Sequence, residues 1–509
     1  MYKGYNEFML DKDIKLKPHI HDLSGQISPA VFTVFGATGD LSLRYIMPTL
    51  LHMDNENLLS DGFKIVAAGR RDITDAGYFK LLDEAGFLPT VPASVLSRFK
   101  SRCKYVSASF EEPETFSKLK EAIDILESDV SGHICYDRFY YFAVAPKYFS
   151  IGARALHEQG LLSICPKHKK TIRIMLEKPF GADAKSAAAL NKDLHKYFTE
   201  DQIYRADHYL GKETVQNILV LRFANEFLEP IWNKKYIDHI EVSVLESDGI
   251  GKRGKTYDSV GALKDVVQNH ILQLLALITM EKPKNASAEA LRDSKTTILK
   301  SLVKFTSQTI PKNIVRGQYQ TSGNKSSYLE DLEENKSDTE TYVAVKTQIK
   351  NSRWSGVPIY LRTGKRLVSR IAEISIHFKE DKNNVFAKNT AANVLSIYLQ
   401  PEEIVSLQVN SKIPGTAGIH QANMIFDYAQ QFESDTPPAY EKLFLDFFNG
   451  DQRLFIRSDE AEASWKFIDS ITNNWNIKNS PIQKYSSGSE GPSASEKLIK
   501  SDSRSWRTK

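Results

Sequence analysis

The sequence has few cysteines, no long hydrophobic run and little net charge. Its three cysteines, Cys103, Cys135 and Cys165, are scattered, so they lack the close spacing of metal sites or disulfide frameworks. The longest apolar-rich stretch, residues 271–280, is interrupted by a glutamine and is too short to cross a bilayer. The N-terminus is polar to about Ser28 and has no apolar core of the signal-peptide type. We therefore expect neither secretion nor a membrane span, and a cytoplasmic location.

Basic and acidic residues nearly cancel, since 67 Lys and Arg stand against 63 Asp and Glu and leave a net charge of +4. This balance argues against nucleic acid as a partner, and any attraction for an anion must be local. Hydrophobic residues make up 41% and charged residues 26% of the chain, which excludes a disordered or fibrous protein. At 509 residues we expect two large globular domains, with three as the alternative.

The first half of the chain alternates strand-like and helical patterns. Four segments predict buried strands, at residues 30–35, 64–69, 138–144 and 172–176. Strands that alternate with helices are typical of a parallel, doubly wound sheet. We predict a Rossmann-like dinucleotide-binding domain over residues 28–206.

The second half contains strand-like segments with fewer helices between them. These segments are residues 237–245, 342–349, 371–378, 394–399 and 405–409. Such closely spaced strands favour a mostly antiparallel sheet. We predict a larger α+β domain over residues 207–485 for substrate binding and oligomerisation. Residues 486–509 are rich in Ser, Gly, Pro and Lys, which predicts a loose tail.

A glycine-containing turn follows the first predicted strand and opens a helix. Gly36 and Gly39 permit a tight turn and the close approach of a phosphate to backbone N–H groups, as in dinucleotide sites. With two glycines only, the pattern also fits a simple turn. After the second strand, where NAD enzymes commonly place Asp or Glu, the chain has Arg70, which would attract a 2′-phosphate. The sequence therefore favours NADP, with NAD as a secondary possibility.

Residues 205–212 crowd an acid, a histidine, a phenol and a lysine into eight positions. If the segment from His208 is helical, Lys212 shares its face, and an imidazole and an ammonium converge on one anion. Asp207 then points elsewhere and can orient a base. Taken alone, the segment also fits a solvated helix start with ordinary surface charges.

Lys178 and His270 are further candidates for chemistry. Lys178 follows a predicted strand at the edge where ligands bind in such sheets, and a cis bond to Pro179 would aim its amine into the cleft. A surface lysine in a turn is the alternative. His270 near Asp265 suits a general base, whereas its place on an apolar stripe also suits a core histidine. On a regular helix these two residues lie about 140° apart, so we expect them to do different jobs.

Together, these motifs resemble those of the glucose-6-phosphate dehydrogenase family, in the same order. They are residues 36–41 with 46–50, 177–181, 205–212, 265–270 and 357–365. The resemblance covers roughly residues 30–480, and the tail is similar to the bacterial form of the family. It implies oxidation of glucose 6-phosphate at C1 to 6-phosphogluconolactone with hydride transfer to NADP, the first step of the oxidative pentose phosphate pathway. It also implies a homodimer or homotetramer and no metal.

The resemblance assigns roles to the matching positions. His270 is expected to be the general base, with Asp207 stabilising its imidazolium. Substrate-binding positions are Lys178, His208, Tyr209, Lys212, Glu246, Asp265, Lys365, Arg370 and Gln400. Cofactor-binding positions are Gly36, Thr38, Gly39, Asp40, Leu41, Arg70 and Lys178.

One segment departs from the family pattern. Tyr45 stands where the family normally places a lysine near cofactor and substrate, and Arg44 should point about 100° away from it on a helix. This departure leaves a non-catalytic paralogue that senses NADP or sugar phosphate as one alternative. A second alternative is a sugar dehydrogenase of the Gfo/Idh/MocA type, although an unphosphorylated sugar would give His208 and Lys212 no anionic partner.

Overall fold

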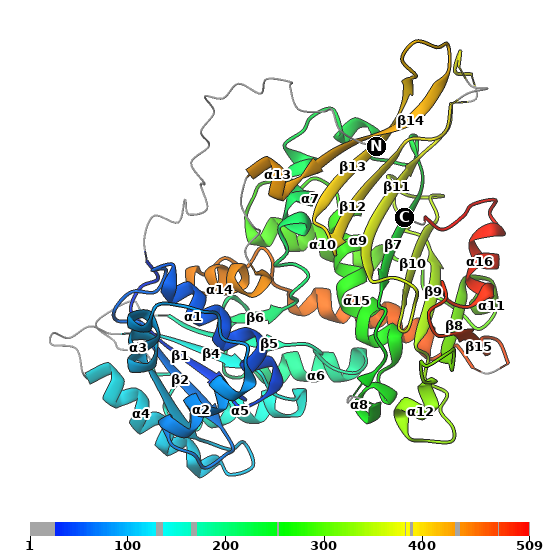
Figure 1. Ribbon diagram of the computed structural model, residues 1–509. Helices are drawn as coiled ribbons and strands as arrows, with labels where there is room; N and C mark the ends of the chain where they lie inside the picture. Colours follow the sequence, from blue (N-terminus) through cyan, green and yellow to red (C-terminus); the bar gives the residue numbers. More distant parts are fainter. Residues whose placement is uncertain are drawn as a thin grey trace.

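A computed structural model of the chain describes residues 26–128, 136–163, 171–251, 254–381, 383–386, 390–432, 438–476 and 478–507. Cys135, Cys165 and most of the polar N-terminal segment lie outside these ranges. The described residues form two sheets, one in each half of the molecule (Figure 1). None of their helices is long and apolar enough to span a membrane.

The first sheet has six parallel strands in the order β3-β2-β1-β4-β5-β6. They are β1 (Ala30–Phe35), β2 (Lys64–Gly69), β3 (Cys103–Ser107), β4 (Asp137–Phe142), β5 (Ile172–Glu177) and β6 (Ile203–Ala206). The four predicted strands are present, but β3 and β6 were not predicted because β3 follows a helix directly and β6 has four residues. The strand order reverses between β1 and β4, so a ligand crevice is expected at their carboxyl ends.

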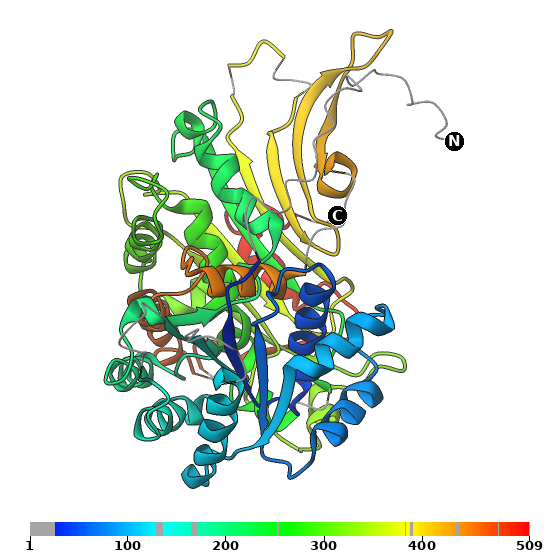
Figure 2. The ribbon, with the colours of Figure 1, turned by 90° about the vertical axis from the view of Figure 1, so that its left-hand side faces the viewer.

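Helices cover both faces of this sheet (Figures 1 and 2). They are α1 (Met47–Asn55), α2 (Asp75–Ala85), α3 (Ala93–Arg102), α4 (Phe116–Ser128), α5 (Phe149–Glu158) and α6 (Ala184–Leu194). One helix on the face beside α1 comes from the far end of the chain. This is α14 (Ala439–Asn449), whose Phe444 and Phe448 rings lie 5.6 and 5.1 Å from the ring of Phe32 on β1. The C-terminal part of the sequence thus completes the core of the first sheet.

The second sheet has nine strands in the order β14-β13-β12-β11-β7-β10-β9-β8-β15. Its first strands along the chain are β7 (Ile237–Leu245), β8 (Ile314–Gln320), β9 (Tyr342–Thr347), β10 (Ile359–Gly364) and β11 (Ile371–Phe378). The others are β12 (Val394–Gln400), β13 (Ile404–Lys412), β14 (Ile419–Asp427) and β15 (Ile482–Ser486). All neighbouring pairs are antiparallel except β7 with β10 and β8 with β15, so the mostly antiparallel prediction is confirmed.

Helices lie mainly on one side of this sheet, as the two ribbon views show (Figures 1 and 2). The longer ones on that side are α7 (Glu213–Phe223), α9 (Leu272–Thr279), α10 (Ala288–Ser301) and α15 (Ser458–Thr472), whereas α16 (Ser493–Lys500) packs on the other face. The short ones are α8 (Gly254–Asp258), α11 (Ile310–Asn313), α12 (Tyr328–Leu332) and α13 (Tyr428–Phe432).

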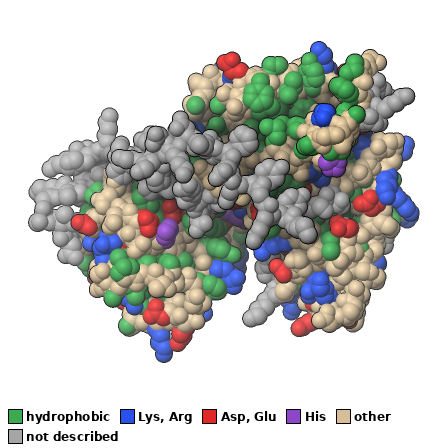
Figure 3. Space-filling view, turned by 45° about the horizontal axis from the view of Figure 1, so that its top comes forward, with side chains coloured by type: hydrophobic (Ala, Val, Ile, Leu, Met, Phe, Trp, Pro, Cys, Tyr) green, Lys and Arg blue, Asp and Glu red, His purple; other side chains and the backbone are tan. Residues whose placement is uncertain are grey.

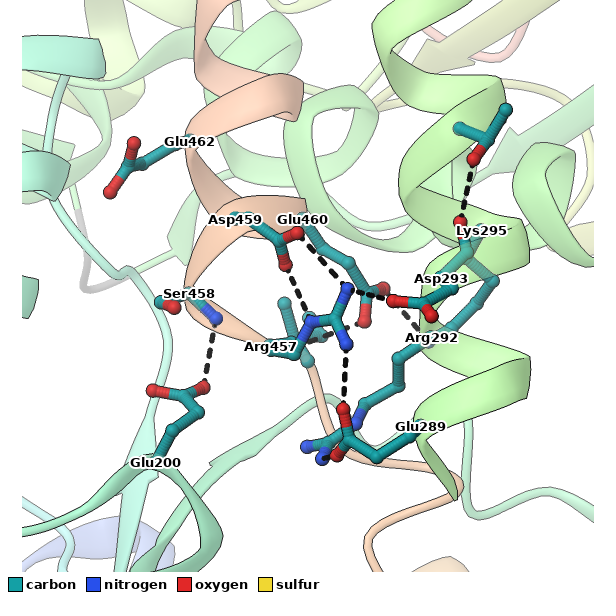
Figure 4. Close-up of polar contacts among 12 residues, drawn as sticks. Glu200, Glu289, Arg292, Asp293, Lys295, Arg457, Ser458, Asp459, Glu460 and Glu462 are labelled. Carbon is teal, nitrogen blue, oxygen red and sulfur yellow. Dashed lines mark hydrogen bonds and ion pairs between the residues drawn. The ribbon is translucent and has the colours of Figure 1, made fainter. Parts of the chain in front are cut away.

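Ion pairs hold α15 against α10, and a backbone hydrogen bond holds it against the first domain. Arg457 at the start of α15 binds Glu289 and Asp293 of α10 at 2.8 and 2.6 Å (Figure 4). The next backbone N–H, that of Ser458, donates to Glu200 Oε1 at 2.9 Å, and Glu200 begins the short turn that leads into β6. Because a guanidinium binds several carboxylates at once, Arg457 fixes α15 against α10, while the Ser458 N–H ties the same helix start to the first domain.

The loose tail predicted from residue 486 is wrong for the described residues. β15 pairs with β8, α16 follows, and the Trp506 side chain is buried with its Nε1 donating to the Ser495 carbonyl at 3.1 Å. The small and polar residues of the tail suggested solvation, but its few apolar side chains lie on one side and pack against the second sheet.

Candidate active site

The candidate base lies on a widened helical segment beside the end of β6. Leu263–Ile271 forms a π-helical segment that continues into α9, and it buries His270. Asp207 directly follows β6, and its Oδ1 lies 2.5 Å from His270 Nδ1. Such π-helical turns are rare and often occur at functional sites. The carboxyl edge of the first sheet therefore delivers the carboxylate, while the second domain delivers the imidazole.

Lys178 approaches the other ring nitrogen of the same histidine. It follows β5, its peptide bond to Pro179 is cis, and its Nζ lies 2.8 Å from His270 Nε2. Nζ also donates to the Asp265 carbonyl oxygen at 3.0 Å and lies 3.8 Å from the Asp265 carboxylate. The 140° separation of Asp265 and His270 was expected for a regular helix, and this segment is π-helical instead, so a single lysine contacts both residues.

The two partners of His270 define its protonation. A proton on Nδ1 is held by Asp207, which leaves the Nε2 lone pair facing Lys178. Burial lowers the pKa of His270 below the ordinary histidine value, the charge of Asp207 opposes this and the Lys178 ammonium adds to it. Burial disfavours ionisation of Asp207, but His270 beside it holds the pKa of Asp207 well below its usual range. At neutral pH the pair is thus a carboxylate and a neutral imidazole.

The segment from His208 is not helical, so His208 and Lys212 do not share a helix face. His208 to Gly211 form successive turns, and Lys212 is the residue that precedes α7. The Tyr209 backbone N–H donates to Asp207 Oδ1 at 3.0 Å, and the Tyr209 ring stacks on the His270 ring at 4.2 Å. The His208 ring lies 4.8 Å from His270 in an edge contact. The turns therefore aim both aromatic side chains at the base.

The predicted anion clamp contains one charge and two neutral groups. Burial lowers the pKa of His208 to about 3, and neighbouring His270, Lys178 and Lys212 add to this shift. His208 is therefore neutral at pH 7, and Lys212 supplies the charge. Lys212 Nζ lies 3.4 Å from Glu403, a partner that the sequence analysis did not foresee. An anion bound here competes with that carboxylate for the ammonium.

The remaining predicted sugar contacts come from strand ends of the second sheet. Lys365, after β10, lies 2.5 Å from Glu246, after β7, and 4.0 Å from Asp265. Gln400, at the end of β12, donates to the Tyr209 hydroxyl at 3.3 Å. Burial and the charge of Glu246 raise the pKa of Tyr209, whereas the charge of the exposed Arg370 lowers it. The structure thus brings residues from three strand ends and the π-helical segment close to the base.

The glycine turn after β1 has the shape that a dinucleotide site requires. Gly36 has φ +79°, and a Cβ there would lie 2.3 Å from the Ala143 carbonyl oxygen after β4. The Gly39 N–H donates to the Gly36 carbonyl at 2.9 Å, so the turn is tight. Thr38 lies beside Gly69 at the end of β2, and the exposed Arg70 follows. A tight turn with a free approach to its backbone N–H groups is the kind of site that could hold the phosphates of a nicotinamide dinucleotide.

The helix expected after this turn begins as a π-helical segment, Ser42–Ile46, before α1. Asp40 there is exposed and pairs with Arg44 at 3.2 Å. The Arg44 guanidinium also lies over the Phe87 ring at 4.7 Å. Arg44 therefore makes contacts on the outer side and does not replace the lysine that the family pattern places at residue 45.

Tyr45 connects instead to the residue before Lys178. Its ring stacks on that of Tyr440 from α14 at 5.8 Å, and the Tyr440 hydroxyl donates to Glu177 Oε1 at 3.2 Å. Tyr141 on β4 also donates to Glu177. Burial raises the pKa of Glu177 to about 7, although both phenols oppose this by binding its charged form. Tyr141 and Tyr440 were missed by the sequence analysis, since no local pattern links α14 to β5.

Most of the chain matches models of two known domains. Residues 33–217 match "Glucose-6-phosphate dehydrogenase, NAD binding domain", and residues 219–507 match "Glucose-6-phosphate dehydrogenase, C-terminal domain". The chain is 39% identical over 493 residues to the glucose-6-phosphate 1-dehydrogenase of Rhizobium meliloti (strain 1021), covering 94% of this chain and 98% of that protein. It is 38% identical over 493 residues to the enzyme of Mycolicibacterium smegmatis, with the same coverage.

Solved structures agree. A glucose-6-phosphate dehydrogenase in complex with its substrate glucose-6-phosphate superposes with a TM-score of 0.87 at 32% identity, covering 95% of this chain and 100% of that chain. The enzyme from Mycobacterium avium superposes with a TM-score of 0.81 at 32% identity, covering 94% and 98%. The resemblance found in the sequence is therefore confirmed. The similarities support that interpretation and not a sugar dehydrogenase of the Gfo/Idh/MocA type.

Proposed function

The chain belongs to the glucose-6-phosphate dehydrogenase family, and on that premise we propose that His270 and Asp207 catalyse its oxidation of glucose 6-phosphate at C1, with NADP as the acceptor. The observation that carries the proposal is the line of contacts from Asp207 through the two nitrogens of His270 to Lys178. A buried neutral imidazole with an oriented carboxylate is suited to remove a proton from a hydroxyl group at neutral pH.

In the proposed chemistry, one acceptor takes the proton of the C1 hydroxyl group and another takes the hydride of the C1–H bond. His270 Nε2 takes the hydroxyl proton while a C1–O double bond forms, which yields 6-phosphogluconolactone. The nicotinamide ring supplies the acceptor for the hydride that leaves C1. Asp207 stabilises the imidazolium as it forms, because its charge lies against Nδ1. Lys178, whose Nζ already lies beside Nε2, positions the hydroxyl group between its own ammonium and the His270 ring.

The substrate is held at both ends in this proposal. Lys212 pairs with the 6-phosphate and His208 and Tyr209 donate hydrogen bonds to it, since a dianion gains most from a charge-assisted contact. The sugar hydroxyls contact the remaining predicted residues, which are Lys178, Glu246, Asp265, Lys365, Arg370 and Gln400. Alternating acids and lysines suit hydroxyl groups, which both donate and accept hydrogen bonds.

The acceptor is held by the turn after β1. Gly36, Thr38, Gly39, Asp40 and Leu41 contact its phosphates and ribose, Arg70 binds the 2′-phosphate and Lys178 lies near the nicotinamide. Arg70→Ala should lower kcat/KM with NADP by at least tenfold and change that with NAD little, because only NADP carries the 2′-phosphate. Arg71→Ala, at the adjacent exposed position, is the matched control. Equal loss with both acceptors would contradict the assignment of Arg70.

The direct test of the function is NADPH formation. Purified full-length protein with glucose 6-phosphate and NADP should produce NADPH, and free glucose at the same concentration should react far more slowly because it lacks the phosphate. Absence of turnover with either nicotinamide cofactor would refute the proposal. Binding of NADP or sugar phosphate in a thermal-shift assay without turnover would favour the sensing paralogue.

The location and assembly are also proposed. We place the protein in the cytoplasm and the domain boundary between residues 206 and 207. We also propose that a second copy of the chain binds to the outer part of the second sheet. β14 is an edge strand, and Met424 and Ile425 on it are 63% and 60% exposed. Hydrophobic side chains gather on this side of the surface (Figure 3). An exposed apolar edge strand is a ready surface for self-association.

Sedimentation velocity tests the assembly. The wild-type protein should be a dimer or tetramer, and Met424→Lys with Ile425→Lys should yield a smaller species. Val220→Lys on α7, where the side chain is 57% exposed, is the matched control and should leave the assembly intact. A monomeric wild-type protein, or an unchanged double variant, would contradict the proposal.

A further inference from the structure

A cluster of two histidines and a glutamate lies on the second sheet, away from the active site. His239 and Glu241 are on β7, and His377 is opposite His239 on the antiparallel neighbour β11. Because side chains alternate along a strand, all three point to the same face. The intervening Ile240 joins the hydrophobic core on the helical side, together with segments that carry the active site. The cluster therefore faces the opposite side of the sheet.

The cross-strand register brings the three donor groups together. The His239 and His377 rings stack at 3.9 Å with planes 15° apart. His239 Nε2 lies 3.3 Å and His377 Nε2 lies 3.0 Å from the same oxygen, Glu241 Oε1. Two ligands of a tetrahedral zinc ion, each about 2.0–2.1 Å from the metal, are roughly 3.3 Å apart. The three atoms, all within 4.8 Å of one another, thus have nearly the spacing of three ligands of one ion.

A second layer of contacts orients these groups. His239 Nδ1 lies 2.7 Å from the Asp238 carboxylate, which two Arg504 nitrogens hold at 2.7 and 2.8 Å. The Arg507 backbone N–H donates to Glu241 Oε2 at 3.0 Å, so Oε1 is the oxygen that faces the imidazoles. Histidine ligands of metals characteristically donate their other N–H to a carboxylate, and ligating carboxylates are hydrogen-bonded in turn. The carboxylate beside His239 leaves its Nε2 as the nitrogen for coordination.

We propose that His239, Glu241 and His377 bind a divalent cation of the zinc class through Nε2, Oε1 and Nε2. Two imidazoles and one carboxylate suit Zn²⁺, and water can complete a tetrahedron around it. Arg504 and Arg507 belong to the C-terminal segment that packs on this face, so the ion holds that segment on the sheet. The site is separate from the proposed dehydrogenase chemistry, which uses His270 and requires no metal.

Zinc titration of the full-length, chelator-treated protein tests the site. Calorimetry should detect one saturable Zn²⁺ site per chain, and Co²⁺ in its place should show the visible absorption of a tetrahedral complex. His377→Gln removes a ligand and should weaken Zn²⁺ binding at least tenfold. His195→Gln is the matched control, since His195 also lies beside a glutamate, Glu200 at 2.8 Å, and should bind as the wild type does.

Two further variants distinguish this site from the histidine cluster of the active site. Asp238→Asn keeps all three ligands but loses the orienting carboxylate, and it should weaken binding by roughly 10- to 100-fold. It tests the proposal even if His377→Gln fails to fold. Asp207, His208 and His270 form the other group among the described residues with similar spacing, so His270→Asn should leave zinc binding unchanged. The proposal would be overturned if the wild-type protein showed no saturable binding, or if folded His377→Gln and Asp238→Asn bound Zn²⁺ as tightly as the wild type does. Loss of binding in His270→Asn would overturn it too.

Discussion

The ammonium nitrogen of Lys178 lies 2.8 Å from Nε2 of His270, the ring nitrogen that faces away from Asp207. One imidazole is therefore held between a carboxylate and a cation. These two groups follow the carboxyl ends of the neighbouring parallel strands β6 and β5. The carboxylate fixes the tautomer, and the cation keeps the imidazole unprotonated. This arrangement leads to separate predictions for each of the three residues.

Replacing His270 by Asn should remove the base and keep the volume of the site. We expect kcat to fall by roughly 10²- to 10⁴-fold, the usual contribution of a general base. The dissociation constant for glucose 6-phosphate, measured by calorimetry, should change little, because other residues hold the phosphate. His195→Asn, at an exposed position, is the control and should keep normal kinetics. A near-normal rate in His270→Asn would refute its role as the base.

The pH profile should report both neighbours of His270. The positive charge of Lys178 lowers the pKa of His270 in addition to burial, and Asp207 opposes that shift. The base must be neutral, so kcat/KM falls as pH drops through this pKa. Lys178→Gln should raise the pKa and move the acid limb to higher pH, whereas Asp207→Asn should move it to lower pH. Limbs that stay in place, or that move the other way, would contradict these charge relationships.

The glycine turn after β1 should not tolerate a side chain. The backbone at Gly36 has φ +79°, a conformation that is strained for a residue with a Cβ. The Cβ of Gly36→Ala would also lie 2.3 Å from the Ala143 carbonyl oxygen. Gly415 has a similar φ of +75° but nothing within 4 Å of the added atom. Gly415→Ala should cost about 1–2 kcal/mol in the free energy of unfolding, and Gly36→Ala should cost more. Equal losses in urea titrations would show that the turn can relax.

The Tyr440 hydroxyl should matter more to stability when Glu177 is charged. Tyr440→Phe removes a hydrogen bond that lowers the Glu177 pKa, so that pKa rises further above about 7. In the folded variant, Glu177 then keeps its proton to higher pH. The loss in free energy of unfolding, relative to the wild type, therefore grows as pH rises through about 7. We expect a loss of about 1.5–3 kcal/mol at pH 8 and less at pH 6. Tyr140→Phe, which loses a bond to a backbone carbonyl, should show no such pH dependence.

The C-terminal segment should contribute to global stability. Trp506 is buried, stacks its ring under the Arg362 guanidinium at 4.3 Å and donates to the Ser495 carbonyl. Trp506→Ala should lower the free energy of unfolding by about 3–5 kcal/mol, as expected for a large buried side chain. Lys500→Ala, whose side chain is 65% exposed, should change it by less than about 0.5 kcal/mol. Similar unfolding midpoints for both variants would restore the idea of a loose tail.

Much of the first sheet could be predicted because its strands are strongly apolar and are separated by helices and turns. β6 could not, because its four residues include Arg205, whose burial is compensated by Glu200 and Asn191. In the second sheet β10 was missed for a similar reason. Its Arg362 is buried against Ser243 and Trp506, residues that no local pattern associates with it. Buried charges with distant partners are invisible to a hydrophobic pattern.

The sequence by itself determined which residue types were available for chemistry and in what order, since His270, Asp207 and Lys178 belong to short motifs that can be recognised without a structure. Only the tertiary structure decided how they meet. The π-helical turns bring Asp265 and His270 to one lysine, the turns after β6 replace the expected helix, and α14 carries Tyr440 to Glu177. Local patterns report backbone preference and solvent exposure. Contacts between segments far apart in the chain depend on how whole elements pack, and that information is spread over the entire sequence.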